Sequence, residues 1–238
     1  ENKRFRLRGV YSFWAAQSDG DDVELYTDAS LNESLGAFRF LRQQKEKPSD
    51  STYYSLADFV APKSRGRTDS LGGFAVTAGP EVEEYAETFK QAHDDYRAIM
   101  TQALGDRFAE AMAEYMHKQV RDRWGFGLTE NLETSALIGE QYRGIRPAAG
   151  YPACPDHTEK GKLWELLDAE ANTGISLTES YAMNPPSSVS GLYFGNVEAR
   201  YFKVGKIGKD QIESYAKRKG IEVSVAEKWL QPNLDYTP

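Results

Sequence analysis

The sequence predicts an α+β fold, an antiparallel twisted sheet with helices packed on it, and three observations support this prediction. Strand-like runs come in pairs joined by short polar turns, which is typical of hairpins. Segments with helical periodicity lie between these pairs, and the longest covers residues 81–124. The 238 residues, 40% of them hydrophobic, provide enough apolar surface for one domain with a sizeable core.

The strands of the first third of the chain are indicated by short apolar runs between polar turns. Residues 9–26 contain two such runs on either side of the polar turn at 18–21, which predicts a hairpin. Residues 55–60 and 73–78 are expected to form two more short strands around a basic, glycine-containing loop at 63–67.

Two helical regions are expected between these strands. A helix that ends near Pro48 is predicted by apolar residues at intervals of three, namely Leu35, Phe38 and Leu41. Residues 81–124 predict one long helix or two in line, with a bend near Gly105, where the apolar stripe changes direction. On this helix Asp106 and Glu110 share a polar face one turn apart.

Two further helices are expected in the middle of the chain. The weaker candidate covers residues 132–142. The better candidate covers residues 158–172, with Thr158 as its N-cap and Gly174 as its C-terminal stop.

The C-terminal part predicts a second hairpin followed by two helices. Residues 189–194 and 200–207 are expected to pair across a glycine-containing turn. A helix over residues 210–219 is followed by a stop glycine, and a last helix begins with capping-box spacing between Ser224 and Glu227.

The composition excludes several classes of protein. The net charge is −7 and the basic residues are scattered, so a nucleic-acid partner, whose phosphates need a positive surface, is not expected. No apolar run approaches the roughly 18 residues of a membrane span, and the first residues lack the apolar core of a signal peptide. Cys154 is the single cysteine and cannot form an internal disulfide, which favours the cytoplasm. Neither GxGxxG nor GxxxxGK[ST] occurs, so the two common nucleotide-binding folds are not predicted.

Residues 143–160, RGIRPAAGYPACPDHTEK, carry the strongest chemical signal. Three prolines and two glycines predict a rigid, irregular loop. Arg146 offers a fixed fork of donors that matches a carboxylate, Tyr151 offers an aromatic face with a hydroxyl, and the small residues 148–150 let a ligand approach the main chain. The loop leads into a helix N-terminus, where negative charge is favoured. The same composition also fits an ordinary surface turn with a salt-bridged arginine.

The run RPAAGYPACPDHTEK resembles the signature of the activation domain of cobalamin-dependent methionine synthase, an Arg-Pro followed by GYPACPDHTEK or a near variant. The resemblance continues in the same order from about residue 9 to the C-terminus, through GVYSFWAAQSDGDDVELY, LADFVAPK, ALGDRFAEAMAEYMH, VSGLYFGNVEARYF and WLQPNLDY. It therefore covers most of that domain.

This resemblance implies a domain that binds S-adenosylmethionine and supports the reductive methylation of inactive cob(II)alamin to methylcobalamin. The cobalamin would be carried by the cobalamin-binding domain of the same enzyme, and a flavodoxin or flavodoxin-like reductase would donate the electron. Because the chemistry would take place between cobalt and the sulfonium methyl group, no catalytic side chain is expected, and the isolated chain is not expected to turn over alone.

The resemblance also implies roles for residues at matching positions. Arg146 matches the arginine that holds the carboxylate of S-adenosylmethionine, Tyr151 lies beside the ligand in the same loop, and Ala148 matches a small residue whose backbone approaches the nucleoside. Tyr201 and Phe202 match an aromatic pair that contacts the ligand, where the family often has two tyrosines. A hydroxyl contact at Phe202 would therefore be lost.

Acidic residues complete the implied site. Glu110 and Glu140 match carboxylates that line the cleft, and Asp106 lies one helical turn before Glu110. A solvated polar helix face equally accounts for the pair on the helix. The resemblance also implies that the family's domain begins further upstream than Glu1 and that an acidic residue for the ligand's amino group is expected in that N-terminal part. Ala15 and Ala16 stand where the family commonly has Pro-Ala.

Metal sites are disfavoured by the residue types. Cys154 and His157 have metal-like spacing, and so have Glu110, Glu114 and His117, but a structural zinc ion normally needs four ligands and neither group supplies them. Cys154 as a nucleophile would need a base, and His157 is the local candidate.

The expected reductase requires a basic surface on this acidic chain. Candidates are two short clusters, namely Lys63, Arg65 and Arg67, or Lys217, Arg218 and Lys219. The alternative function is a non-catalytic module that senses S-adenosylmethionine or binds a protein partner.

Overall fold

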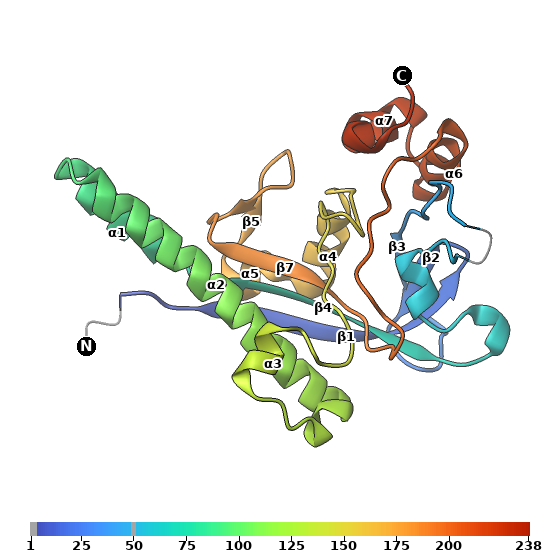
Figure 1. Cartoon of the computed structure of the whole chain (residues 1–238), viewed down its shortest axis with the longest axis horizontal. Helices are drawn as coiled ribbons and strands as arrows, with labels where there is room; N and C mark the ends of the chain where they lie inside the picture. The colour runs from blue at the N-terminus through green and yellow to red at the C-terminus, as the bar shows by residue number, and fades with distance from the viewer. Residues whose placement is uncertain (1–3, 49–50) are drawn as a thin grey trace. The chain divides into compact units, whose positions relative to one another are not determined.

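The computed structural model describes residues 4–48 and 51–238, and the chain divides into two compact units (Figure 1). Unit 1 consists of Glu1–Ser12, Gly73–Arg143 and Leu163–Gly191, and unit 2 of Phe13–Gly72, Gly144–Lys162 and Leu192–Pro238. Five strands form one sheet in the order β3-β2-β1-β4-β7. The chain also contains helices, one of which is 30 residues long. The predicted α+β fold is therefore confirmed.

The first predicted hairpin is confirmed. Strand β1 (Arg8–Asp19) pairs antiparallel with β2 (Asp22–Tyr26), and Asp19 lies opposite Asp22 across the turn. The strand predicted at 73–78 is confirmed as β4 (Asp69–Thr77), whose residues from Leu71 onward are buried.

The helix predicted to end near Pro48 is wrong, because this segment begins with strand β3 (Ser34–Arg39), which pairs antiparallel with β2. The amide of Thr27 donates to the carbonyl of Glu33, which closes the turn between the two strands. Gly36 has φ 94°, outside the helical region. A run of six residues is too short for an interval of three to distinguish the two structures, and sheet pairing decides the outcome.

The strand predicted at 55–60 is also wrong, because 3-10 helix η1 (Leu56–Phe59) occupies this place. Ser55 and Asp58 form a capping box in which the Ala57 amide donates to Ser55 Oγ at 3.4 Å and the Ser55 amide donates to Asp58 at 2.9 Å. The strand prediction relied on the apolar residues of this segment and did not take the capping-box spacing of Ser55 and Asp58 into account. The basic loop that follows contains a second 3-10 turn, η2 (Lys63–Arg65).

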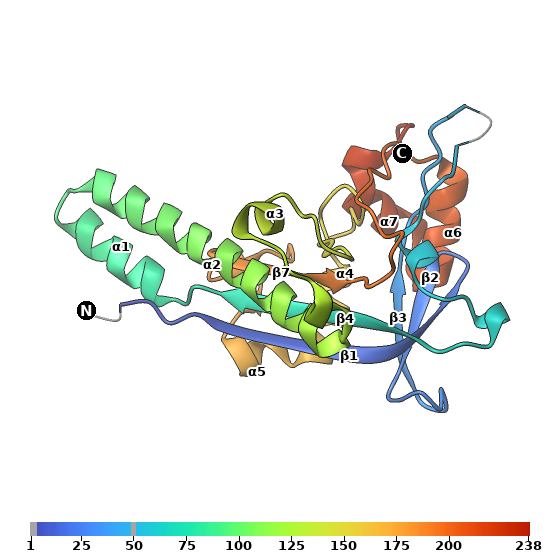
Figure 2. The ribbon, with the colours of Figure 1, turned by 60° about the horizontal axis from the view of Figure 1, so that its bottom comes forward.

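The region 81–124 contains two helices that lie side by side, α1 (Glu81–Gln91) and α2 (Asp95–Trp124) (Figures 1 and 2). The expected long helix is confirmed as α2, which continues through Gly105 without a break. A Cβ on Gly105 would lie 2.5 Å from a methyl carbon of Val82, so this glycine allows α2 to pack closely on α1.

The buried face of α2 is not the one with the large apolar residues. Its buried positions include small residues such as Ala98, Ala109 and Ala113, which suit close helix contacts. The large side chains of the periodic stripe are exposed, namely Tyr96, Ile99, Leu104, Phe108 and Tyr115. The periodicity therefore identifies the helix but not the face that packs.

The helices expected in the middle of the chain are shorter than predicted. Residues 132–142 contain only α3 (Thr134–Ile138), after the 3-10 turn η3 (Phe126–Thr129). The segment 158–172 is divided into α4 (Glu159–Leu167) and α5 (Ala169–Thr173) by Asp168, whose φ is 45°.

The ends of this divided helix differ in outcome. Gly174 follows α5 as its predicted stop, which is confirmed. Thr158 is not the N-cap of α4, because its buried hydroxyl has no hydrogen-bond partner among the described residues. Its amide instead donates to Asp156 Oδ1 at 2.8 Å.

The second predicted hairpin is wrong. Residues 189–194 form a strand, β7 (Ser188–Tyr193), but 200–207 form a loop that ends in a single bridge between Ile207 and Leu234. This loop packs through aromatic rings and backbone bonds that do not require strand pairing. A separate short pair, β5 (Ser176–Leu177) and β6 (Met183–Asn184), was not predicted.

The two C-terminal helices are confirmed as α6 (Lys209–Lys219), which ends at Gly220, and α7 (Val223–Leu230), which leads into the 3-10 turn η4 (Gln231–Asn233). The capping box predicted at Ser224 is wrong, because Ser224 lies inside α7. Both helices cover one hydrophobic core of unit 2, formed by Leu41, Val204, Ile207, Ile212, Tyr215, Ala216, Ala226, Leu230 and Leu234. No helix in the described part of the chain is long and apolar enough to cross a membrane.

Candidate ligand-binding site

The loop that begins at Ile145 is held to the end of β7 by backbone hydrogen bonds. Ile145 and Phe194 exchange two bonds of 3.0 Å, and the Leu192 amide donates to the carbonyl of Pro147 at 2.9 Å. The main chain on both sides of Arg146 is therefore fixed to the sheet, although the sequence itself is too irregular for a strand.

The next residues form a tight turn. The Tyr151 amide donates to the Ala148 carbonyl at 3.2 Å, and the Cys154 amide donates to the Tyr151 carbonyl at 2.9 Å. Gly150 has φ 91°, which favours glycine, and its amide donates to the Cys154 carbonyl at 2.7 Å. The ring of Tyr151 remains 67% exposed, so it is available to a ligand.

The predicted aromatic pair approaches this loop through one of its members. The Arg146 amide donates to the hydroxyl of Tyr201 at 3.1 Å, and the ring of Tyr201 is 46% exposed. Phe202 instead packs against Tyr54 and Phe59, with ring centroids 5.9 and 6.3 Å away. Phe202 therefore has structural contacts that need no ligand.

The second half of the signature is anchored by a buried polar cluster. Asp156 accepts hydrogen bonds from the Tyr215 hydroxyl at 2.6 Å and from Lys219 Nζ at 2.9 Å. Glu159 accepts from the Arg39 amide at 3.1 Å and also forms an ion pair with Lys219. These side chains are nearly inaccessible, because Asp156 and Glu159 are 4% and 5% exposed.

The charges of this cluster depend on each other. Burial acts to raise the pKa of Asp156, but Lys219 and the hydrogen bonds outweigh it, so this pKa lies below its usual range. Burial raises the pKa of Glu159 despite the same ammonium group. Burial acts to lower the pKa of Lys219, but the two carboxylates raise it above its usual value. Lys219 is therefore the counter-ion that keeps both acids in the interior.

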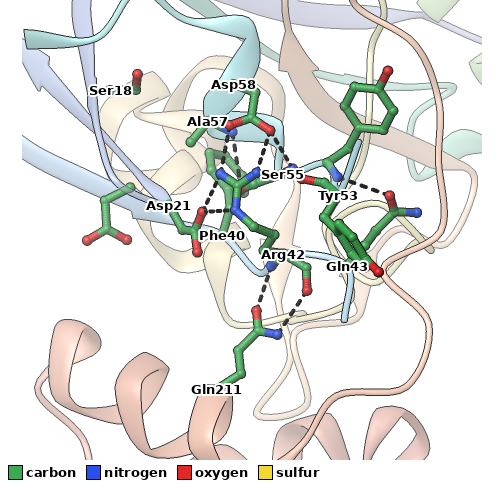
Figure 3. Close-up of polar contacts among 12 residues, drawn as sticks. Ser18, Asp21, Phe40, Arg42, Gln43, Tyr53, Ser55, Ala57, Asp58 and Gln211 are labelled. Carbon is green, nitrogen blue, oxygen red and sulfur yellow. Dashed lines mark hydrogen bonds and ion pairs between the residues drawn. The ribbon is translucent and has the colours of Figure 1, made fainter. Parts of the chain in front are cut away.

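Helix α6 is fixed to a second part of unit 2 through Gln211. The amide of Arg42 donates to Gln211 Oε1 at 2.6 Å, and Gln211 Nε2 donates to the Arg42 carbonyl at 2.9 Å (Figure 3). The guanidinium of Arg42 binds Asp21 and both carboxylate oxygens of Asp58, and it donates to the carbonyl of Tyr53. The same helix therefore braces the signature loop and the segment that carries Tyr54 and Phe59.

Cys154 is a structural residue in this arrangement. Its thiol is buried, and burial raises its pKa well above the usual value, with Glu159 and Asp156 adding to the effect. A neutral thiol is a poor nucleophile. No group of His, Cys, Asp and Glu side chains suited to a metal ion occurs within residues 4–48 and 51–238.

The three predicted acidic residues belong to unit 1. Asp106 accepts a hydrogen bond from the Ser187 hydroxyl at 2.7 Å. Glu110 pairs with the exposed Arg107 at 2.6 Å. Glu140 is exposed and has φ 52°. Asp106 and Glu110 share one face of α2 as predicted, whereas Arg146, Ala148, Tyr151, Tyr201 and Phe202 all belong to unit 2.

A cavity of about 410 Å³ in unit 2 lies on other residues, among them Ser18, Asp58, Arg65, Asp69 and Glu198. None of the predicted ligand residues lines it. Two of its carboxylates already have partners, since Asp58 pairs with Arg42 and Asp69 accepts from the Ala61 amide. We therefore place the candidate site on the open loop and not in this cavity.

Several residues that build the site were missed by sequence reasoning. Tyr215 and Lys219 are four residues apart on α6, so they lie on one face of the helix, and Lys219 has the charge that Asp156 and Glu159 require. This complementarity of charge is the feature of the sequence from which the cluster could have been predicted. Lys219 was instead assigned to a surface patch, and its neighbour Arg218 likewise pairs internally, with Asp22.

Comparison of the sequence with known families identifies a match over most of the chain. The family described as "Vitamin B12 dependent methionine synthase, activation domain" matches residues 1–220 of this chain. The match includes the signature loop, the aromatic pair and all of α6.

Comparison with solved structures supports the same assignment. A crystal structure of the MetH reactivation domain bound to AdoHcy superimposes with a TM-score of 0.96 at 50% sequence identity. The alignment covers 99% of this chain and 72% of that chain. The two chains therefore have the same fold.

Proposed function

We propose that this chain, which belongs to the activation-domain family of vitamin B12-dependent methionine synthases, binds S-adenosylmethionine at the loop 145–151. The observation that carries the proposal is the fixed main chain around Arg146, which is bonded to β7 on both sides and to Tyr201. The related domain with bound AdoHcy supports the ligand class.

The residues of the loop suit an amino-acid ligand that carries a nucleoside. Arg146 has a planar fork of donors, which pairs with the ligand's carboxylate through two hydrogen bonds. Ala148 has no side chain beyond its Cβ, so a ribose or base can approach its main chain. The exposed rings of Tyr151 and Tyr201 offer apolar faces for the nucleoside. Phe202 acts through packing with Tyr54 and Phe59.

Three acidic residues of unit 1 are further proposed ligand residues on the family pattern, namely Asp106, Glu110 and Glu140. Asp106 accepts a hydrogen bond from the Ser187 hydroxyl. Their carboxylates suit the positive charges of the ligand, which are the ammonium group and the sulfonium.

The reaction that this domain serves is the return of inactive cob(II)alamin to methylcobalamin. Cobalamin carried by another domain would supply the methyl-accepting cobalt once an external donor has reduced it by one electron, and S-adenosylmethionine would give up its methyl group and leave as S-adenosylhomocysteine. The present chain binds and orients the donor so that its methyl group faces outward, and this positioning needs no side-chain nucleophile.

The partners we propose are the cobalamin-binding domain of the same enzyme and a flavodoxin or flavodoxin-like reductase, in the cytoplasm. Of the two basic clusters, Lys63, Arg65 and Arg67 suit an acidic reductase better, because Arg218 and Lys219 pair with internal carboxylates. Lys63 itself pairs with Glu24 at 2.8 Å, so Arg65 and Arg67 are the exposed members.

Isothermal titration calorimetry with S-adenosylmethionine tests the site directly. Arg146→Ala removes a charge-assisted pair worth about 1.5–3 kcal/mol, so affinity should fall by roughly 10- to 150-fold. Arg143→Ala is the matched control, because this neighbouring arginine stacks on Phe126 in unit 1. Equal affinity of Arg146→Ala and wild type would refute the site.

A second experiment separates reactivation from mere sensing. The chain is mixed with a cobalamin-bearing fragment of the enzyme and a chemical reductant, and the absorption spectrum is followed after S-adenosylmethionine is added. Formation of methylcobalamin supports the proposal. Tight ligand binding without this change would favour the alternative, a non-catalytic sensing or interaction module.

A further inference from the structure

His157 lies in the signature between the buried acids Asp156 and Glu159, but its ring is not part of their hydrogen-bonded cluster with Tyr215 and Lys219. Its ring occupies the space beside Gly150, where a Cβ would lie 2.1 Å from Cε1, 2.4 Å from Nδ1 and 2.6 Å from Nε2. Gly150 directly precedes Tyr151 and lies two residues after Ala148, and both of these are proposed ligand-facing positions. The imidazole of His157 therefore fills the space that a side chain at position 150 would occupy.

The position of this ring is set by a rigid frame. The residue before it, Asp156, is bonded to Tyr215 and Lys219, and Glu159 two residues later is bonded to Lys219 and the Arg39 amide. Gly150 is held on its other side, because its amide donates to the Cys154 carbonyl at 2.7 Å. The ring therefore connects the braced half of the signature to its ligand-facing half.

The contact of the ring with Lys160 favours its neutral form, although burial also lowers the pKa of Lys160. Lys160 Nζ lies 2.9 Å from His157 Nδ1, and an ammonium group can only donate, so Nδ1 accepts and carries no proton. The charged groups that face the ring are Lys160 and Asp156. Burial, followed by the charge of Lys160, lowers the pKa of His157, and Asp156 only partly opposes this.

We propose that His157 is a positioning residue of the S-adenosylmethionine site, whose neutral ring, held by Lys160, keeps Gly150 and the turn 148–151 in the conformation that the ligand requires. This inference rests on the proposed function of the loop. Protonation of Nδ1 replaces a hydrogen bond by repulsion from Lys160 and displaces the ring from Gly150. Ligand affinity therefore decreases when the ring takes up a proton.

The sign of the pH dependence follows from the lowered pKa. Because the folded protein favours the neutral ring, its contribution is complete above the usual histidine pKa of about 6.5 and is lost as the pH falls below it. The carboxylate and ammonium groups of S-adenosylhomocysteine keep their charges between about pH 5 and pH 7. A change of affinity in this window therefore comes from the protein.

The test is calorimetry with S-adenosylhomocysteine between about pH 5 and pH 7 on wild type, His157→Asn and His157→Ala. Loss of the bond from Lys160, followed by repulsion, should weaken wild-type binding by about tenfold at the acidic end. An asparagine side chain at this position would place its Oδ1 near the site of the imidazole Nδ1. His157→Asn therefore keeps an acceptor for Lys160 but cannot titrate, and its affinity should be constant. His157→Ala should bind about tenfold more weakly than wild type at pH 7, because the ring that packs on Gly150 and its hydrogen bond with Lys160 are both lost.

His93→Asn is the matched control, because His93 is an exposed histidine at the corner between α1 and α2 of unit 1, and its substitution should leave the wild-type pH profile intact. A pH profile of His157→Asn parallel to that of wild type overturns the proposal, and so does wild-type affinity in His157→Ala. Failure of the proposed function looks different, since wild type itself would then bind no ligand or Arg146→Ala would bind it equally well. The pH profile of His157→Asn is informative even where the variant is less stable, because a merely structural role would not remove the titration.

Discussion

Lys219→Met tests whether the buried cluster supports the signature loop. The substitution keeps most of the aliphatic stem but leaves Asp156 and Glu159, which are 4% and 5% exposed, without their ammonium partner. Removing one partner of a buried ion pair costs about 3–5 kcal/mol. The Tyr215 hydroxyl and two backbone amides still donate to these carboxylates, so we expect the lower end, about 3 kcal/mol. For a chain of this length the midpoint of thermal unfolding should fall by roughly 6–12 °C.

The pH dependence of this loss identifies its cause. Without Lys219, burial and mutual repulsion should raise the carboxyl pKa values above those of the unfolded chain. A raised pKa contributes stability below the unfolded value, and this contribution disappears as the pH rises. The difference between variant and wild type should therefore be small near pH ~4 and reach its full size near pH ~7.

Urea unfolding followed by tryptophan fluorescence measures this difference at both pH values. Lys217→Met is the matched control, because Lys217 is exposed on the same helix, and its loss should change the free energy of unfolding by less than about 0.5 kcal/mol. If the loss in Lys219→Met were the same at both pH values, or no larger than in Lys217→Met at neutral pH, the electrostatic account of the cluster would be refuted.

Two further predictions concern single contacts. Tyr201→Phe removes the acceptor of the Arg146 amide, a bond worth about 1 kcal/mol, so affinity for S-adenosylmethionine should fall about fivefold in calorimetry without loss of the fold; unchanged affinity would show that this bond does not set the loop. Gly105→Ala places a methyl group 2.5 Å from a carbon of Val82 on α1, and this overpacking should cost about 1–3 kcal/mol in urea unfolding, whereas an unchanged midpoint would contradict the close packing of α1 and α2.

The parts of the fold that could be predicted are those with local signals. The hairpin of β1 and β2 has a polar turn between apolar runs, and α6 ends at Gly220, as its stop signal indicates. The errors occur where distant contacts decide. Strand β3 has helical spacing in a run of six residues, but pairing with β2 satisfies its backbone.

The proposed site has the same limit. Arg146 and Tyr151 carry donors and an aromatic face that are visible in the sequence, and backbone hydrogen bonds hold the main chain around them. The partners that fix it are distant in sequence. Tyr201 reaches the Arg146 amide across 55 residues, and Lys219 reaches Asp156 across 63. The sequence contains no pattern that pairs the Tyr201 hydroxyl or the Lys219 ammonium group with a partner so far away along the chain.

The signature therefore consists of two functional halves with different physical requirements. The first half, residues 145–151, carries the guanidinium of Arg146 and the exposed ring of Tyr151, so substitutions there should change ligand affinity more than stability. In the second half, Asp156 and Glu159 are buried and need Lys219, so substitutions there should change stability first and affinity as a consequence. His157 contacts both halves, because its ring packs on Gly150 in the ligand-facing turn and forms a hydrogen bond with Lys160 in the second half. A change in the position of the second half should therefore move the turn.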